Sequence, residues 1–327
     1  MTTYADVQRR LDRGAVVLLD GAVGTELQEM GVPMDSTSWA AAALVTHPYT
    51  VRQMHEKYVR AGADIITTNT YASARHNLEP LGQLALTREL NLRAVVLAQE
   101  AVARAGRGRP VLVAGAVSNY GITTEGEPRG ALHRYSPPRT AITAEQARAN
   151  LAEQAEILAD AGVDLLLVES TGGMAHRRWI LEACRATGLP VWLGFKCRQE
   201  AGDSTVRVGY SSATPLADGV RELKGEGSAV IALFHSSVDD TSAGLRILRE
   251  AWSGPVAVYP EASREDYTAA HRDDTPNAIS PEEYLAQARQ WVAQGAQVIG
   301  GCCGIGVSYI RALREGLPAS IPSGPRG

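Results

Sequence analysis

Two adjacent cysteines near the end of the chain stand inside a glycine-rich segment, Gly300-Gly301-Cys302-Cys303-Gly304. Adjacent side chains of a strand normally point apart, but flanking glycines let the backbone turn sharply and aim both sulfurs at one point. Two thiolates suit Zn²⁺, and a third protein ligand with an open fourth position would make the site catalytic. Two cysteines lack the specificity of a paired CxxC pattern, so two small buried residues are an equally good interpretation of this spacing alone.

Composition and charge limit the binding partners and the cellular location that we can expect for this protein. The 327 residues carry a net charge of -4, which supplies no field to hold nucleic acid or an anionic membrane. The amino-terminal segment lacks an apolar signal core, and no stretch approaches the roughly 18 apolar residues of a membrane helix. Four cysteines are too few for the disulfide scaffold of a secreted protein. We therefore expect a cytoplasmic protein with small-molecule partners, and neither nucleic acid nor a membrane among them.

Eight short apolar runs rich in β-branched residues recur along the chain, separated by segments with helical periodicity. Continuous apolar runs indicate strands buried on both faces, as in a parallel sheet covered by helices. Eight strand and helix units in about 250 residues is the count of an α/β fold of the (β/α)8 TIM barrel type. We predict a single domain over residues 1–316 and a carboxy-terminal tail over 317–327. The predicted strands are 16–22, 64–71, 111–118, 165–170, 191–197, 229–235, 256–260 and 297–303.

Helix boundaries support this reading. Helices are predicted over 48–61, 87–104 and 143–161, the last opening with a Thr143/Gln146 capping box. Another begins after Ser280, with Pro281 at its first position. A doubly wound open sheet is the alternative, but it would need a GxGxxG turn after the first strand, and Gly21-Ala22-Val23-Gly24-Thr25 does not supply one.

Polar residues follow nearly every predicted strand. The carboxyl ends of barrel strands build the active site, so these side chains should converge. For any one of them a hydrogen-bonded strand end is the simpler interpretation, and the prediction of a site depends on the convergence. The set is Asp20, Asn69, Thr70, Ser118, Asn119, Glu169, Cys197, His235, Ser236, Glu261, Cys302 and Cys303.

Several of these segments together resemble the homocysteine S-methyltransferase family, which includes betaine-dependent and S-methylmethionine-dependent enzymes. The resemblance runs nearly end to end and in order. Its segments are LLDGAVGTEL (18–27), AGADIITTNTYAS (61–73), AGAVSNYG (114–121), GVDLLLVES (162–170) and GGCCGIGVSYIRAL (300–313). The last of these is similar to the family's closing metal motif.

The resemblance implies a zinc-dependent transfer of a methyl group from a sulfonium or quaternary ammonium donor, such as S-methylmethionine or betaine, to a thiol such as homocysteine. Zinc would replace the proton on the acceptor's sulfur and keep it nucleophilic. The resemblance assigns Asp20 and Glu169 to the acceptor's amino group, and a salt bridge at the barrel mouth is their alternative. Aromatic faces suit a cationic donor, which points to Tyr71 and, more weakly, to Trp39, although both rings could simply be packed. Asn69 and Thr70 join the predicted substrate-binding set.

The sequence departs from the family at its third metal ligand, a cysteine preceded by asparagine after the sixth strand. His235 stands in the asparagine position here and Ser236 in the cysteine position. Serine is a poor neutral ligand for zinc, whereas Cys302, Cys303 and His235 would form an accepted catalytic set. A shift by one residue turns a side chain to the other face, so His235 can ligate only where the strand has ended or bulges.

A second departure follows the seventh strand, where Glu261 and Ser263 replace the family's asparagine and glycine. A carboxylate here could ligate a metal or bind a cation, so Glu261 completes the predicted substrate-binding set. These changes leave two alternatives open: a zinc-independent member acting on a different methylated small molecule, and a non-catalytic amino-acid-binding barrel. Barrels of this kind commonly associate, but the sequence identifies no interface, so a homo-oligomer stays open, as does the identity of donor and acceptor.

Overall fold

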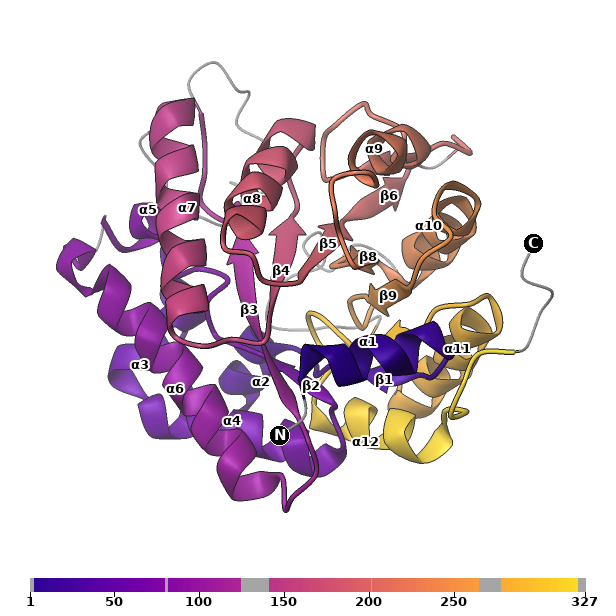
Figure 1. Cartoon of the computed structure of the whole chain (residues 1–327), viewed down its shortest axis with the longest axis horizontal. Helices are drawn as coiled ribbons and strands as arrows, with labels where there is room; N and C mark the ends of the chain where they lie inside the picture. Colours follow the sequence, from indigo (N-terminus) through magenta and orange to yellow (C-terminus); the bar gives the residue numbers. More distant parts are fainter. Residues whose placement is uncertain (1–2, 80–81, 125–140, 201, 265–277, 323–327) are drawn as a thin grey trace.

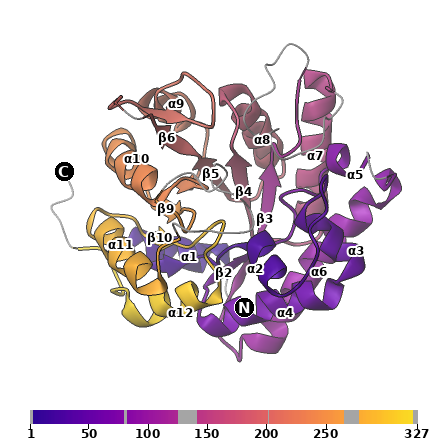
Figure 2. The same cartoon turned by 180° about the vertical axis from the view of Figure 1, so that it is seen from behind.

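Eight parallel strands form a barrel surrounded by helices (Figures 1 and 2). The computed structural model describes residues 3–79, 82–124, 141–200, 202–264 and 278–322. The hydrogen-bonded order is β1-β10-β9-β8-β5-β4-β3-β2, and a parallel bridge between Leu19 and Ile65 joins its two ends. The predicted (β/α)8 barrel is confirmed. Its strands are β1 (Val17–Leu18), β2 (Ile65–Thr67), β3 (Leu112–Ser118), β4 (Leu165–Ser170), β5 (Val191–Phe195), β8 (Val230–Phe234), β9 (Val256–Tyr259) and β10 (Val298–Ile299).

Helices lie between the strands and begin and end close to the predicted boundaries. Gly62, Gly162 and Gly295 follow helices with positive φ, the left-handed conformation that glycine adopts most easily. The helices are α1 (Tyr4–Asp12), α2 (Val23–Glu29), α3 (Ala43–Thr46), α4 (Pro48–Ala61), α5 (Arg75–Leu78), α6 (Thr87–Ala105), α7 (Ala144–Asp160), α8 (Met174–Ala186), α9 (Leu216–Leu223), α10 (Val238–Ala251), α11 (Pro281–Ala293) and α12 (Val307–Gly316), with 3-10 turns at Ala40–Ala42 and Leu84–Leu86.

One capping prediction is half right. Thr143 accepts a hydrogen bond from the Gln146 backbone N–H, but the Gln146 side chain bonds Asn150 instead of closing the box. Ser280 and Glu283 form a complete capping box at the start of α11. In both cases the cap satisfies a backbone donor that the first helical turn leaves unpaired.

The core has two layers because strand residues alternate between two faces. Along β8, Val230, Ala232 and Phe234 fill the barrel interior, while Ile231 and Leu233 pack under the helices. Helix α1 covers the amino-terminal end of the strands, with Val7 and Leu11 in the interior cluster (Figure 1). Helix α1 therefore closes the amino-terminal end of the barrel, which leaves the carboxyl ends of the strands as the side where a ligand can enter.

Two features lie outside the sequence prediction. An antiparallel hairpin, β6 (Cys197–Gln199) and β7 (Val206–Val208), follows β5 directly. Part of the predicted tail is ordered by pairing, since Val16 N–H bonds the Ala319 carbonyl and Ile321 N–H bonds the Gly14 carbonyl. Residues 323–327 of that tail lie outside the described residues.

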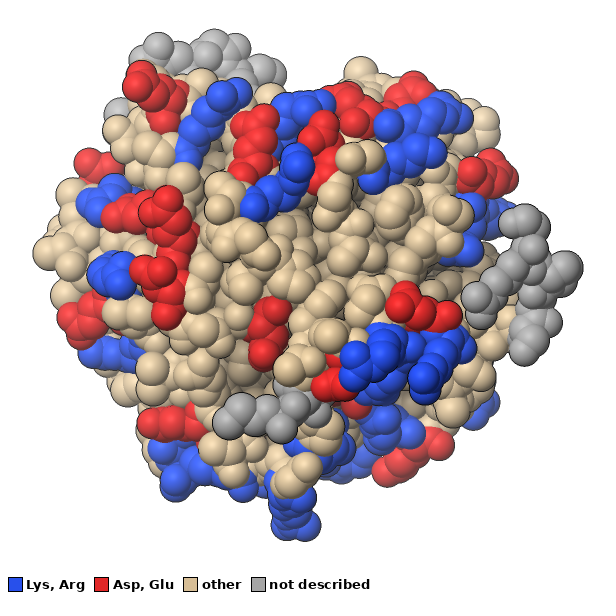
Figure 3. Space-filling view, in the orientation of Figure 1, with Lys and Arg blue, Asp and Glu red and all other residues tan. Residues whose placement is uncertain are grey.

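The face shown in Figure 3 carries acidic and basic side chains in neighbouring groups, most of them around its edge. Within the described ranges, every helix is too short or too polar to cross a bilayer.

Candidate active site

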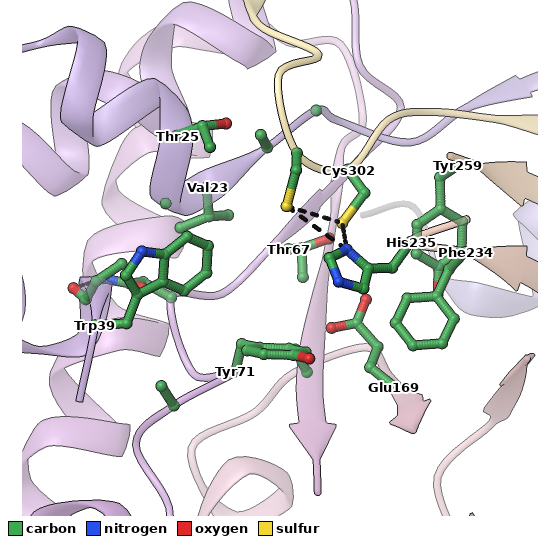
Figure 4. A pocket seen from close by; sticks show the side chains of 18 of the residues that line it. Val23, Thr25, Trp39, Thr67, Tyr71, Glu169, Phe234, His235, Tyr259 and Cys302 are labelled. Carbon is green, nitrogen blue, oxygen red and sulfur yellow. Dashed lines mark hydrogen bonds between the residues drawn. The ribbon is translucent and has the colours of Figure 1, made fainter. Parts of the chain in front are cut away.

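His235, Cys302 and Cys303 meet at the mouth of the barrel. The Nδ1 atom of His235 lies 3.3 Å from the Cys302 sulfur and 3.6 Å from the Cys303 sulfur, and the two sulfurs are 4.0 Å apart. The imidazole and the sulfur of Cys302 face each other in Figure 4. These three ligand atoms form a group that could hold a metal ion, as the sequence predicted for these three residues.

The end of β8 explains how His235 reaches the sulfurs. The strand stops at Phe234, and His235 has a φ of 47°, in the left-handed region. This turn sends the imidazole into the barrel mouth. The hydroxyl of Ser236 points elsewhere, donating to the Phe234 carbonyl at 3.0 Å and accepting from the Cys197 N–H at 2.9 Å. The condition set by the sequence, that the strand ends before His235, is met.

A tight loop brings the two thiols together. Strand β10 ends at Ile299, so both cysteines lie beyond it. A Cβ on Gly301 would lie 2.1 Å from the Ile305 side chain, so only glycine allows this close packing. Gly304 has a φ of 78° and donates its N–H to the Thr25 hydroxyl at 3.0 Å. The loop is thus fixed to the start of the barrel, which aims both sulfurs inward.

The charges beside the thiols come from two buried residues. A carboxylate oxygen of Glu261, which is fully buried, lies 3.0 Å from His235 Nδ1. Burial lowers the pKa of His235, but Glu261 and the Cys302 sulfur outweigh it and raise that pKa to about 9. The adjacent Cys303 sulfur and burial raise the pKa of the Cys302 thiol well above its ordinary value. The cluster therefore stores protons that an incoming cation would displace.

Two further carboxyl groups, those of Asp20 and Glu169, line the mouth. Asp20 accepts hydrogen bonds from the Thr67 N–H at 2.7 Å and the Thr67 hydroxyl at 2.9 Å. Burial raises its pKa to about 8, against those hydrogen bonds. Burial also raises the pKa of Glu169 to about 7, while His235 and a hydrogen bond with Tyr259 lower it. Both groups can gain or lose a proton near neutral pH, as suits residues that receive a charged ligand.

A cavity of about 180 Å³ connects these groups and has largely apolar walls. Tyr71 lies between two other rings of the wall: its ring centroid is 6.4 Å from that of Trp39, in a T-shaped arrangement, and 5.5 Å from that of Tyr120. In Figure 4, Trp39 lies across the cavity from His235, and Tyr71 lies below and between them. The aromatic residues lining it are Trp39, Tyr71, Tyr120, Tyr210, Phe234 and Tyr259.

The predicted substrate-binding residues do not all reach this cavity. Asp20, Asn69, Tyr71 and Glu169 line it, and Asn69 also donates to the Ala40 carbonyl at 2.8 Å. Thr70 is fully buried in the wall, where its hydroxyl bonds the Ala116 carbonyl at 2.8 Å. Glu261 is fully buried against His235 Nδ1 and is not among the lining residues.

The sequence pattern does not single out several residues of the site. Tyr259 is the last residue of β9, and Tyr120 follows the end of β3. The rule that active-site residues lie at the carboxyl ends of barrel strands could therefore have identified both. Lys196 is a charge inside the otherwise apolar run 191–197, which is itself a signal. Tyr210 lies in a polar segment after the hairpin, and nothing in the sequence marks it as a site residue.

Comparisons with known proteins agree with this architecture. A family model described as homocysteine S-methyltransferase matches residues 17–317. The homocysteine S-methyltransferase of Escherichia coli is 30% identical over 313 residues, covering 93% of this chain and 96% of the relative. A selenocysteine methyltransferase of Astragalus bisulcatus is 27% identical over 327 residues, covering 92% of each. The crystal structure of the metallated form of the homocysteine methyltransferase MmuM from Escherichia coli superposes with a TM-score of 0.72 at 28% identity, covering 94% of this chain and 99% of that one.

Fold and site together define a TIM-barrel enzyme with a thiol-rich mouth. The chain belongs to the homocysteine S-methyltransferase family. It is an S-methyltransferase, an enzyme that moves a methyl group to a thiol, which favours catalysis over the non-catalytic binding barrel.

Proposed function

We propose that this enzyme is zinc-dependent and transfers a methyl group from a sulfonium or quaternary ammonium donor to homocysteine. The observation that supports zinc best is the spacing of the three ligand atoms. A tetrahedral zinc with bonds of about 2.3 Å to sulfur and 2.0 Å to nitrogen separates two sulfurs by about 3.8 Å and sulfur from nitrogen by about 3.5 Å. In this structure the two sulfurs lie 4.0 Å apart, and His235 Nδ1 lies 3.3 and 3.6 Å from them.

The donor set fits a catalytic rather than a structural zinc. Two cysteines and one histidine are three protein ligands, which leaves the fourth position to substrate. Cys302, Cys303 and His235 all line the cavity, so that position faces the ligand. Zinc bound there would supply the acidity that keeps the acceptor thiol deprotonated at neutral pH.

The carboxyl groups of Asp20 and Glu169 suit the ammonium group of an amino-acid acceptor. Both line the same cavity as the thiols. A cation between them offsets the burial that raises their pKa values. Binding an ammonium group therefore favours the ionised carboxylates and orients the acceptor with its sulfur towards the cysteine loop.

The aromatic wall suits the cationic methyl donor. The rings of Trp39, Tyr71 and Tyr120 contact one another in sequence and line the cavity. Ring faces attract a sulfonium or ammonium without hydrogen-bonding to it, and they leave the methyl group free to react. The donor then lies between this wall and the acceptor sulfur. This placement lets the sulfur approach the methyl carbon in line with the bond that breaks.

Metal analysis tests the zinc assignment. Protein purified without chelator should contain one zinc per chain, and Cys302→Ala and His235→Ala should each lose it. Cys184 is a buried free cysteine in α8, so Cys184→Ala is the matched control and should keep full zinc. Wild-type protein without metal in zinc-replete medium would overturn the assignment.

Methyl transfer assays test the substrates. Homocysteine should be methylated with S-methylmethionine or betaine as donor. Tyr71→Leu should raise the KM of the donor about 5- to 30-fold, because a desolvated cation–π contact contributes on the order of 1 to 2 kcal/mol. Tyr71→Phe keeps the ring and should retain the wild-type KM. Equal donor KM values in the wild type, Tyr71→Leu and Tyr71→Phe would show that the Tyr71 ring does not bind the donor.

A further inference from the structure

We propose that Lys196 and Tyr210 are positioning residues that hold His235 in place as a metal ligand. The inference rests on the proposed zinc site and adds to it the two residues that direct its histidine. It answers a question posed by the sequence, namely how a histidine one position ahead of the family's cysteine can serve in its place.

Lys196 fixes the backbone of His235. Its side chain is fully buried directly after β5, and its ammonium donates to the His235 carbonyl at 2.8 Å. A left-handed backbone is unfavourable for a residue other than glycine, so the surroundings must hold it. The His235 N–H also bonds the Tyr259 carbonyl at 3.3 Å. Contacts on both sides of the residue therefore maintain the turn that sends its imidazole towards the sulfurs.

Tyr210 fixes the ring. Its hydroxyl lies 2.6 Å from His235 Nε2, the nitrogen that faces away from the thiols. With Nδ1 on the metal, Nε2 carries the proton and donates it to the tyrosine oxygen. Partners of this kind set the tautomer and orientation of a ligating histidine.

The two positioning residues also contact each other. The Lys196 ammonium lies 4.3 Å from the centre of the Tyr210 ring. The backbone holds the tyrosine there, because Gly209 N–H bonds the Lys196 carbonyl at 2.8 Å and Tyr210 N–H bonds the Thr171 carbonyl at 3.2 Å. The hairpin β6–β7 spans the chain between Lys196 and Gly209, so its role is to return the backbone to His235. One unit, starting at the end of β5, thus supports both backbone and ring of the ligand.

Zinc affinity, measured by competition with a chromogenic chelator on the full-length protein, tests this directly. Tyr210→Phe removes one hydroxyl and should weaken zinc binding about 10- to 100-fold. Tyr4→Phe is the matched control: its hydroxyl accepts from Trp192 Nε1 at 3.0 Å at the other end of the barrel. That variant should bind zinc as the wild type does. Equal affinity in Tyr210→Phe and wild type would overturn the inference.

A spectroscopic signature separates positioning from general stability. In the zinc-bound wild type, the Nε2 proton of His235 should give a downfield, exchange-protected nuclear magnetic resonance signal. Tyr210→Phe should lose that protection while its metal-free melting temperature falls by no more than a few degrees, as the loss of one hydrogen bond predicts. Retention of the protected signal in Tyr210→Phe would contradict the role of the hydroxyl.

Lys196→Met tests the backbone contact in the same competition assay, with weaker zinc binding expected. Should this variant fail to fold, Tyr210→Phe decides. Failure of the proposed function gives a different pattern, because the wild type would then bind no zinc, or His235→Ala would bind it as tightly as the wild type. Loss of zinc in His235→Ala together with wild-type affinity in Tyr210→Phe and Lys196→Met refutes only the positioning role.

Discussion

His235 Nδ1 lies 3.3 Å from the sulfur of Cys302, while the hydroxyl of the next residue along the chain points away from the cavity. The left-handed backbone at His235 produces this division. In the proposed metal site, this turn makes residue 235 the third ligand in place of residue 236, and the direction of each side chain can be tested.

Restoring the family's cysteine at position 236 should not create a better metal site. The Ser236 side chain is fully buried and bonds the Phe234 carbonyl and the Cys197 N–H. Ser236→Cys should therefore leave zinc affinity unchanged and should not rescue His235→Ala. Chelator competition measures both variants, and tighter binding in either one would show that position 236 faces the metal.

Acceptor binding should strengthen as pH rises towards about 8. The buried Asp20 carboxyl has a pKa of about 8, facing Thr67 and the charge of Glu169, so it is largely neutral at pH 6 and ionised at pH 9. The KM for the acceptor should fall with increasing pH, by at most about tenfold per unit below that pKa. Asp20→Asn should have a higher KM and lose this part of the pH dependence. Parallel pH profiles in the two proteins would contradict the role of Asp20, and the donor KM is the internal control.

The protein should lose stability in mild acid because of His55 in α4. This side chain is fully buried, and neither ring nitrogen has a hydrogen-bond partner in the described part of the chain. Burial lowers its pKa to about 3, below its ordinary 6.5. Between those values the unfolded chain takes up a proton that the folded chain refuses, so the free energy of unfolding falls by about 1.4 kcal/mol per pH unit below 6.5.

Replacing His55 should remove this dependence. His55→Leu keeps the packing apolar and breaks no hydrogen bond, so its urea-unfolding free energy should fall less steeply from pH 6.5 to 4.5 than that of the wild type. The difference between the two slopes isolates His55 from the carboxyl groups that titrate in the same range. Equal slopes would mean that the ring takes up its proton in the folded protein at the same pH as in the unfolded chain.

Gly301→Ala should damage both stability and the metal site. An added methyl group would lie 2.1 Å from the Ile305 side chain, so the cysteine loop must move. We expect a loss of about 1 to 3 kcal/mol of unfolding free energy and weaker zinc binding. Gly225→Ala is the control, since nothing lies within 4 Å of its added methyl group. A wild-type zinc affinity in Gly301→Ala would show that the loop tolerates displacement.

Much of this architecture could be predicted from local sequence. The strand runs and the glycines after helices, such as Gly62 and Gly162, encode the barrel because burial and backbone handedness act over a few residues. The convergence of Asp20, Glu169 and the two cysteines then follows from the barrel itself.

The remaining details depend on contacts distant in sequence. The direction of Ser236 follows from the backbone turn at His235, whose carbonyl accepts a hydrogen bond from Lys196, directly after β5. Tyr210 lies in a polar segment whose alternation does not predict a strand, so its arrival beside His235 could not be read from the chain. Thr70 is polar like Asn69 and equally close to the strand end, yet a buried carbonyl holds its hydroxyl in the wall.

The seam between β1 and β10 has a consequence for biosynthesis. Val17 pairs with Val298 and Leu18 with Ile299. The first strand can therefore complete its pairing only after the last strand has been synthesised. Both thiols follow that last strand and lie 67 and 68 positions after the histidine they meet. If the proposed metal site is right, a nascent chain must be almost completely synthesised before it can bind the ion, so metal loading would follow the folding of the last strand.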